Sequence, residues 1–128
     1  MTRDELAEIY RGYIDCLNKQ DWASLIDCVH DAVRYNGILV GLVGYRTMLQ
    51  DDYRAIPDLS FTVDLLICDP PHIASRLQFD CTPHGDLFGY PVNGKRVRFA
   101  ENVFYKFDGA RIREVWSIID KAAIPHQL

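Results

Sequence analysis

The chain has 128 residues, of which 48% are hydrophobic and 25% are charged, and its formal net charge is −4. A chain of this length is expected to fold as one domain, residues 1–128, with a substantial buried core. The composition is typical of a soluble globular protein. The acidic balance argues against a general nucleic-acid-binding protein, because such proteins are usually basic.

The sequence carries no pattern that predicts a membrane, metal or cofactor partner. Its start, MTRDELAEIY, is acidic and unlike a signal peptide, and no apolar run approaches membrane-spanning length, so we expect a cytoplasmic protein. The four cysteines and four histidines lack metal-ligand spacing, which favours buried thiols and no metal site. No phosphate loop, dinucleotide fingerprint or GxSxG motif is present, and we expect no cofactor.

The first half of the chain predicts three helices. Thr2 and Glu5 have the spacing of a capping box, and apolar residues then recur at helical spacing over residues 3–18. Asp21 can cap a second helix over residues 22–29, and a third is expected over residues 44–55 with Tyr53 on its inner side. Tyr13 lies in the apolar stripe of the first helix, where its hydroxyl is either satisfied within the core or directed into a pocket.

The second half predicts four long antiparallel strands. From Ser60 the apolar period changes to two, which indicates strands over residues 60–68 and 73–81. A long loop from Thr82 to Gly94, of the kind that often forms a lid or rim, leads to a hairpin over residues 95–120 that turns at Asp108-Gly109. Helices followed by strands indicate an α+β fold, with three N-terminal helices packed on a curved, mostly antiparallel sheet.

The last strand ends in a carboxylate that is a candidate proton carrier. Strict alternation places Asp120 on the same face as Trp116 and Ile118. A carboxylate beside large apolar side chains is partly desolvated, which raises its pKa and suits it to general acid–base chemistry. The other interpretation is a solvated residue at the end of the strand.

The partner strand leaves two alternatives for a second polar group beside Asp120. In one register Glu101 and Tyr105 share its face, whereas a bulge of one residue would replace them with Asn102 and Phe104. Because two neighbouring carboxylates repel each other, Asn102 is slightly favoured as a pocket residue.

The sequence contains the segments DWASLIDCVHDAVRYNG, AIPDLSFTVDLLI and GDLFGYPVNGKRVRFAENVFYKFDGARIREVWSIID. These three segments resemble the SnoaL-like polyketide cyclases of the nuclear transport factor 2-like superfamily, and the resemblance covers about residues 4–120. The most specific parts are PDLSFTV, the G-x-x-x-G-x-P-x-x-G-[KR]-x-V loop and the closing W-x-x-x-D. The resemblance implies a cystatin-like cone enclosing an apolar pocket, and a homodimer formed through the sheet.

The resemblance also implies a function and a site. It implies a cofactor-free enzyme of isomerase or lyase type acting on an apolar or aromatic small molecule with an activated carbonyl, such as a cyclase closing a ring by aldol addition. Asp120 falls on the acid/base position of the family, and Tyr13 and Asn36 fall on polar pocket positions. His84 is displaced by one position from the histidine of many members, so we expect it at the rim.

The expected substrate pocket is mainly aromatic and apolar. Its members are Trp116, Asn102, Phe99, Tyr105, Ile118 and Tyr53. Two alternatives stay open, a binding protein that uses the pocket without chemistry and a dehydratase or isomerase with the same base.

Overall fold

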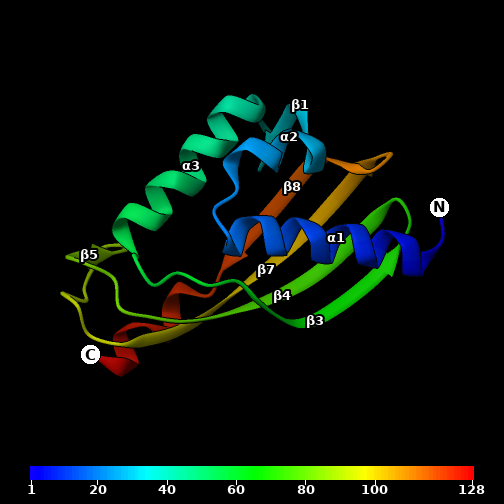
Figure 1. Ribbon diagram of the computed structural model, residues 1–128. Helices are drawn as coiled ribbons and strands as arrows, with labels where there is room; N and C mark the ends of the chain where they lie inside the picture. The colour runs from blue at the N-terminus through cyan, green and yellow to red at the C-terminus, as the bar shows by residue number, and fades with distance from the viewer.

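The computed structural model describes residues 1–128 as helices packed on one face of a curved six-stranded sheet (Figure 1). The strand order is β2-β1-β8-β7-β4-β3. The strands of this sheet are β1 (Val29–Tyr35), β2 (Ile38–Leu39), β3 (Thr62–Asp69), β4 (His72–Cys81), β7 (Val97–Asp108) and β8 (Arg111–Ile119). The helices are α1 (Arg3–Asn18), α2 (Leu25–Cys28) and α3 (Gly41–Ala55), with short 3-10 turns at Trp22–Ser24, Lys121–Ala123 and Pro125–Gln127. The predicted α+β class and helix-covered sheet are confirmed.

The first helix begins and ends where the sequence predicts. The Thr2 side chain accepts a hydrogen bond from the backbone of Glu5 at 3.1 Å, and the Glu5 carboxylate accepts one from the backbone of Thr2 at 3.3 Å. This capping box satisfies N–H groups that have no partner within the helix. The buried face of α1, which includes Leu6 and Leu17, packs toward the sheet.

The second helix is shorter than predicted. A 3-10 turn at Trp22–Ser24 leads into only four residues of α2, and the chain is already extended at Val29. The strand β1 pairs in parallel with β8, which gives it a partner far away in the sequence. α3 begins at Gly41, three residues earlier than predicted, at a positive φ of 69° that glycine adopts without strain.

A bulge in β8 decides which side chains face the helices. Phe107 pairs with Ile112, but the next pair is Lys106 with Glu114, so Arg113 has no partner in β7. One extra residue reverses the alternation for the rest of the strand.

After the bulge, Val115, Ser117 and Ile119 face the helices. Trp116 and Ile118 therefore lie on the outer face, where their exposed fractions are 40% and 72%. The predicted alternation through Asp120 is wrong for this reason.

The predicted loop between β4 and β7 contains a small hairpin of its own. Its strands are β5 (Asp86–Leu87) and β6 (Tyr90–Pro91), which form a separate two-stranded sheet. Figure 1 places β5 beside the C-terminal end of α3, and the backbone N–H of His84 donates to the Ala55 carbonyl at 2.9 Å. The hairpin thus closes one end of the space between α3 and the sheet. No helix of the fold combines the length and apolar character that a membrane crossing requires.

Candidate functional site

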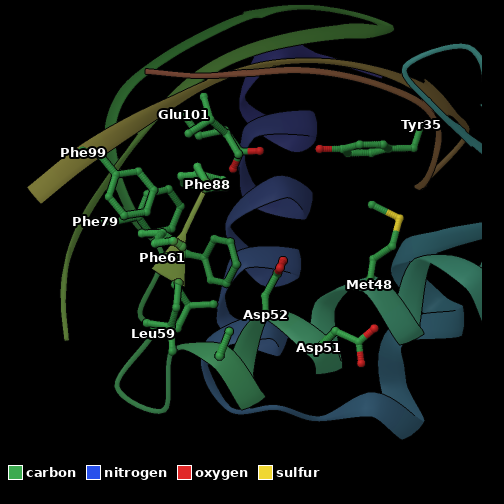
Figure 2. Close-up of a pocket in the computed structure, with 14 residues that line it drawn as sticks. Tyr35, Met48, Asp51, Asp52, Leu59, Phe61, Phe79, Phe88, Phe99 and Glu101 are labelled. Atoms are coloured by element: carbon green, nitrogen blue, oxygen red, sulfur yellow. The ribbon is translucent and has the colours of Figure 1, made fainter. Parts of the chain in front are cut away.

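A pocket of about 370 Å³ lies between α3, the sheet and the β5–β6 hairpin (Figure 2). Its walls are mostly apolar, and the polar exceptions are carboxylates and a tyrosine hydroxyl. The lining residues are Tyr35, Met48, Asp51, Asp52, Ala55, Ile56, Leu59, Phe61, Phe79, Leu87, Phe88, Phe99, Glu101 and Ile119. A mainly apolar cavity with a few polar groups is the usual form of a small-molecule site.

One wall of the pocket is a continuous set of phenylalanine rings. The rings of Phe61 and Phe79 lie 5.3 Å apart edge to face, and Phe79 stacks on Phe99 at 5.0 Å. Phe88, on the turn of the hairpin, meets Phe99 edge to face at 5.7 Å. Such a surface suits a flat ligand, because aromatic rings pair well in stacked and edge-on arrangements.

Glu101 is the carboxylate at the sheet side of this pocket. It lies on the inner face of β7 opposite Ile119, and the Ser117 hydroxyl donates a hydrogen bond to its Oε2 atom. Burial raises the pKa of Glu101 above its usual range, while the Ser117 hydrogen bond acts in the opposite direction. A carboxylate with a raised pKa is suited to proton transfer near neutral pH.

Asp52 projects from α3 into the same pocket (Figure 2). Burial raises its pKa to about 6, and the negative charges of Glu101 and Asp51 add to the rise. Water still reaches much of the Asp52 residue through the open side of the pocket, so the carboxyl group is enclosed by the protein without being cut off from solvent.

Tyr35 completes the polar end of the pocket. Figure 2 shows its hydroxyl directed toward the Glu101 carboxylate from the opposite side. Burial raises the pKa of Tyr35, so the hydroxyl keeps its proton at neutral pH and can donate a hydrogen bond.

A smaller cavity of about 50 Å³ lies behind Glu101 and Asp52 and is lined in part by buried tyrosines. The hydroxyls of Tyr13 and Tyr45 lie 2.7 Å apart, and that of Tyr105 accepts a 3.4 Å hydrogen bond from Tyr10. Tyr13 and Tyr105, both predicted for the substrate site, line this inner cavity and do not line the main pocket.

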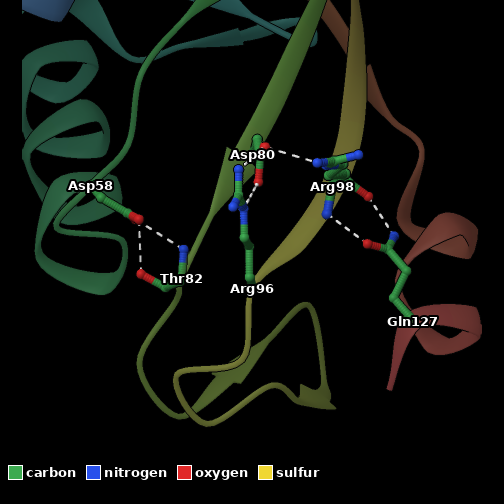
Figure 3. Close-up of polar contacts among 6 residues, drawn as sticks. All are labelled: Asp58, Asp80, Thr82, Arg96, Arg98 and Gln127. Carbon is green, nitrogen blue, oxygen red and sulfur yellow. Dashed lines mark hydrogen bonds and ion pairs between the residues drawn. The ribbon is translucent and has the colours of Figure 1, made fainter.

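The base of the hairpin loop is held by exposed polar contacts (Figure 3). The Asp58 carboxylate accepts hydrogen bonds from the backbone and hydroxyl of Thr82, at 2.9 and 2.8 Å. Asp80 binds the Arg96 guanidinium through both oxygens, each at 2.6 Å, and also contacts Arg98. These contacts tie the start of the loop to the connection between α3 and β3 and its end to β4, and they position the hairpin over the pocket.

The structure corrects the predicted position of Asp120. Its side chain is exposed beyond the end of β8, on the outer side, and does not line the pocket. The bulge at Arg113 is the cause, and it also places Trp116 and Ile118 outside.

Three further predicted pocket residues have other positions. Asn102 lies on the outer face, where its side-chain oxygen accepts a 2.9 Å hydrogen bond from Arg76. Tyr53 is buried and donates to the Leu17 carbonyl at 2.7 Å. Asn36 is exposed and binds the backbone of Ser117 at 2.8 and 3.3 Å, so it acts on the pocket only through that residue.

Phe99 lies in the main pocket, together with residues that the sequence analysis did not assign to it. Glu101 is the less favoured of the two alternatives that the sequence leaves open, and Asp52 and Tyr35 are not among the predicted pocket residues. A signal for Asp52 existed, because it follows Met48 by four residues on the apolar side of α3. His84 is exposed, as expected for a rim position. No group of three or more His, Cys, Asp or Glu side chains is arranged to hold a metal ion.

Helices over a curved sheet, with an apolar pocket between them, define a cystatin-like cone of the nuclear transport factor 2-like class. The family model described as SnoaL-like polyketide cyclase matches residues 7–128. The chain belongs to this family, which supports a role as a small-molecule cyclase or isomerase.

Solved structures agree with this assignment. A SnoaL-like polyketide cyclase from Agrobacterium tumefaciens is 48% identical, with a TM-score of 0.95 over 99% of this chain and 98% of the other. TsrD from Streptomyces laurentii is 21% identical, with a TM-score of 0.85 over 99% and 96% of the two chains. IdmH from Streptomyces antibioticus is 18% identical, with a TM-score of 0.83 over 95% and 96%. The last two show a shared fold alone. The comparison with curated proteins found no match.

Proposed function

We propose that the protein is a cofactor-free enzyme that transfers protons on an activated carbonyl compound, with Glu101 as the proton carrier. The observation that carries this proposal is the position of Glu101, a partly buried carboxyl group that faces the phenylalanine-lined pocket and whose pKa is raised by burial. It takes the role that the sequence suggested for Asp120, whose side chain lies outside the pocket.

The proposed reaction begins with a C–H bond next to a carbonyl group of the substrate. Ionised Glu101 takes that proton, and the electron pair of the C–H bond moves onto the carbonyl oxygen as an enolate. The Tyr35 hydroxyl donates a hydrogen bond to this oxygen, which stabilises the developing charge. The phenylalanine wall holds the flat substrate and limits access of water.

In a cyclase the enolate carbon then attacks a second carbonyl of the same molecule. A C–C bond forms, the π electrons of that carbonyl move to its oxygen, and Glu101 returns its proton there. The sum is an isomerisation, so no oxidant or reductant is needed. General acid–base catalysis contributes about 10²–10⁴-fold, and positioning of the two reacting ends adds to it.

The test is proton exchange on a panel of flat aryl ketones and β-ketoesters in deuterated water, followed by NMR. We expect Glu101→Gln to reduce exchange by about 10²–10⁴-fold, and Asp120→Asn, the matched change outside the pocket, to leave it unchanged. The proposal is wrong if Glu101→Gln exchanges at the wild-type rate. Binding of the panel without exchange would favour a ligand-binding protein, and product analysis would separate a cyclase from a dehydratase or isomerase.

We also propose that two copies associate through the outer face of the sheet. Large apolar side chains from β3, β7 and β8 gather there and are exposed, namely Leu65, Ile67, Phe104, Trp116 and Ile118. Contiguous apolar patches of this kind usually mark an interaction site. The pocket opens on the opposite side of the sheet, so a homodimer of this type leaves it accessible.

A further inference from the structure

The pocket has a charge imbalance that the proposed reaction does not use. Three carboxylates line it, and no lysine, arginine or histidine is among its lining residues. Asp51 is compensated, because Arg54 pairs with it on the exposed side of α3. Asp52 has no cationic partner and no side-chain hydrogen bond, and Glu101 has only the neutral Ser117 hydroxyl.

A carboxylate that the protein partly desolvates and leaves without a cationic partner is less stable than a fully solvated one, so a cation or a proton stabilises it. Asp52 and Glu101 also repel each other, because both face one cavity. The enolate of the proposed reaction would add a third negative charge beside them. A positive charge on the ligand would relieve both problems at once.

The aromatic wall also favours a positively charged ligand. The rings of Phe61, Phe79, Phe88 and Phe99 line one side of the pocket, beside these carboxylates (Figure 2). The negative face of an aromatic ring attracts ammonium groups, and a carboxylate framed by rings is a favourable site for an amine.

From this arrangement we infer that the pocket selects a flat apolar ligand with a cationic amine at its polar end, and that Asp52 is the residue that determines this selectivity. The inference names the substrate's charge and so rests on the proposed function. The Lys121 ammonium group lies over the Phe88 ring at 5.2 Å and is not among the residues that line the pocket.

The inference predicts that amine binding weakens in acid. With a pKa of about 6, Asp52 is ionised at pH 8 and mostly protonated at about pH 5. The pKa of Glu101 is raised as well, so its protonation acts in the same direction. The remaining titratable groups around the two cavities are Asp51 and the tyrosines Tyr13, Tyr35, Tyr45 and Tyr105. The pKa values of these tyrosines are raised by burial, so they stay neutral in this range.

The experiment compares three probes that share a naphthalene ring by calorimetry, namely naphthylmethyl-trimethylammonium, naphthylmethanol and naphthoate. At about pH 8 we expect the ammonium to bind roughly tenfold more tightly than the alcohol and the carboxylate to bind more weakly than either. At about pH 5 the affinity of the ammonium should fall by about tenfold, while that of the alcohol stays constant.

Two variants serve as test and control. Asp52→Asn should abolish most of the preference for the ammonium without changing the affinity of the alcohol, and Asp27→Asn, the same change at an exposed position on α2 that does not line the pocket, should keep the preference. The inference is overturned if the alcohol binds as tightly as the ammonium, if Asp52→Asn retains the preference, or if no probe binds. All these readouts are affinities, so their failure is distinct from a failure of Glu101→Gln to lose proton exchange.

Discussion

The hydrogen bond from Ser117 to Glu101 allows the proposed proton carrier to be tuned without removing it. The Ser117 hydroxyl stabilises the ionised carboxylate, and its effect is to lower the pKa of Glu101 against the larger effect of burial. In Ser117→Ala this stabilisation is lost, so the pKa of Glu101 rises further. The two Asn36 hydrogen bonds involve only the Ser117 backbone, so the strand stays in place in this variant.

The size of the effect follows from the kind of bond. A hydrogen bond to a charged group contributes about 1.5–3 kcal/mol, which corresponds to about a 10- to 100-fold change in the ionised fraction below the pKa. Glu101 is only partly shielded from water, so the lower end of this range, about tenfold, is the expected loss of rate on the acidic side. At high pH the rate should recover, because the base is then ionised in both proteins.

The assay is the pH dependence of proton exchange on the best ketone of the panel. We expect the acidic limb of the profile to move to higher pH in Ser117→Ala, with an unchanged plateau. Ser24→Ala, the same substitution at a position that does not line the pocket, should follow the wild type. An acidic limb that stays in place, or moves to lower pH, would refute the role of Glu101 as the base.

Three further predictions concern the parts around the pocket. Asn36→Ala loses two hydrogen bonds of about 0.5–1.5 kcal/mol each, so it should lower the free energy of unfolding in urea by about 1–3 kcal/mol. Asn93 is at another left-handed position but makes no side-chain hydrogen bond, so Asn93→Ala should lower the free energy of unfolding by less. Ile118→Glu places a charge on the outer face and should convert a dimer into a monomer in sedimentation, while Ile26→Glu, at an exposed position on α2, should not. Asp52→Asn should stabilise the fold at about pH 8 and not at about pH 4. The pKa of Asp52 is about 6 in the folded protein and 3.8 in the unfolded chain, so the stability of the wild type falls as the pH rises between these values. Unfolding midpoints that are equal for the variant and the wild type at both pH values would contradict this.

Much of the fold follows from local patterns in the sequence. The capping box at Thr2 and the apolar stripe after it define α1, and the period-two alternation locates β4 and β7. The parallel pairing of β1 with β8 has no local signal, because it joins segments about eighty residues apart and depends on how β1 packs under α3. The predicted end of α2 is wrong for the same reason, because Val29 is the first residue of β1 and not the last residue of the helix.

The site was harder to predict than the fold, and one residue explains most of the difference. Alternation counted through Arg113 assigns Asp120 to the interior, whereas the bulge there leaves Glu101 inside and Asp120 outside. The position of a bulge depends on how two whole strands pair, and not on the residues at the bulge alone. The sequence does not assign Asp52 to the pocket, because a single acidic residue on a helix is most often solvated, and only the position of α3 over the sheet brings it to the pocket wall.

The most direct test of the central claim is the titration of Glu101 itself, followed by NMR of its side-chain carboxyl carbon in the folded protein and assigned by its loss in Glu101→Gln. We predict a midpoint above the ordinary glutamate value of about 4.3, because burial in the pocket raises the pKa, and a further shift when an aromatic ligand fills the pocket. A midpoint at the ordinary value that does not respond to ligand would contradict the account.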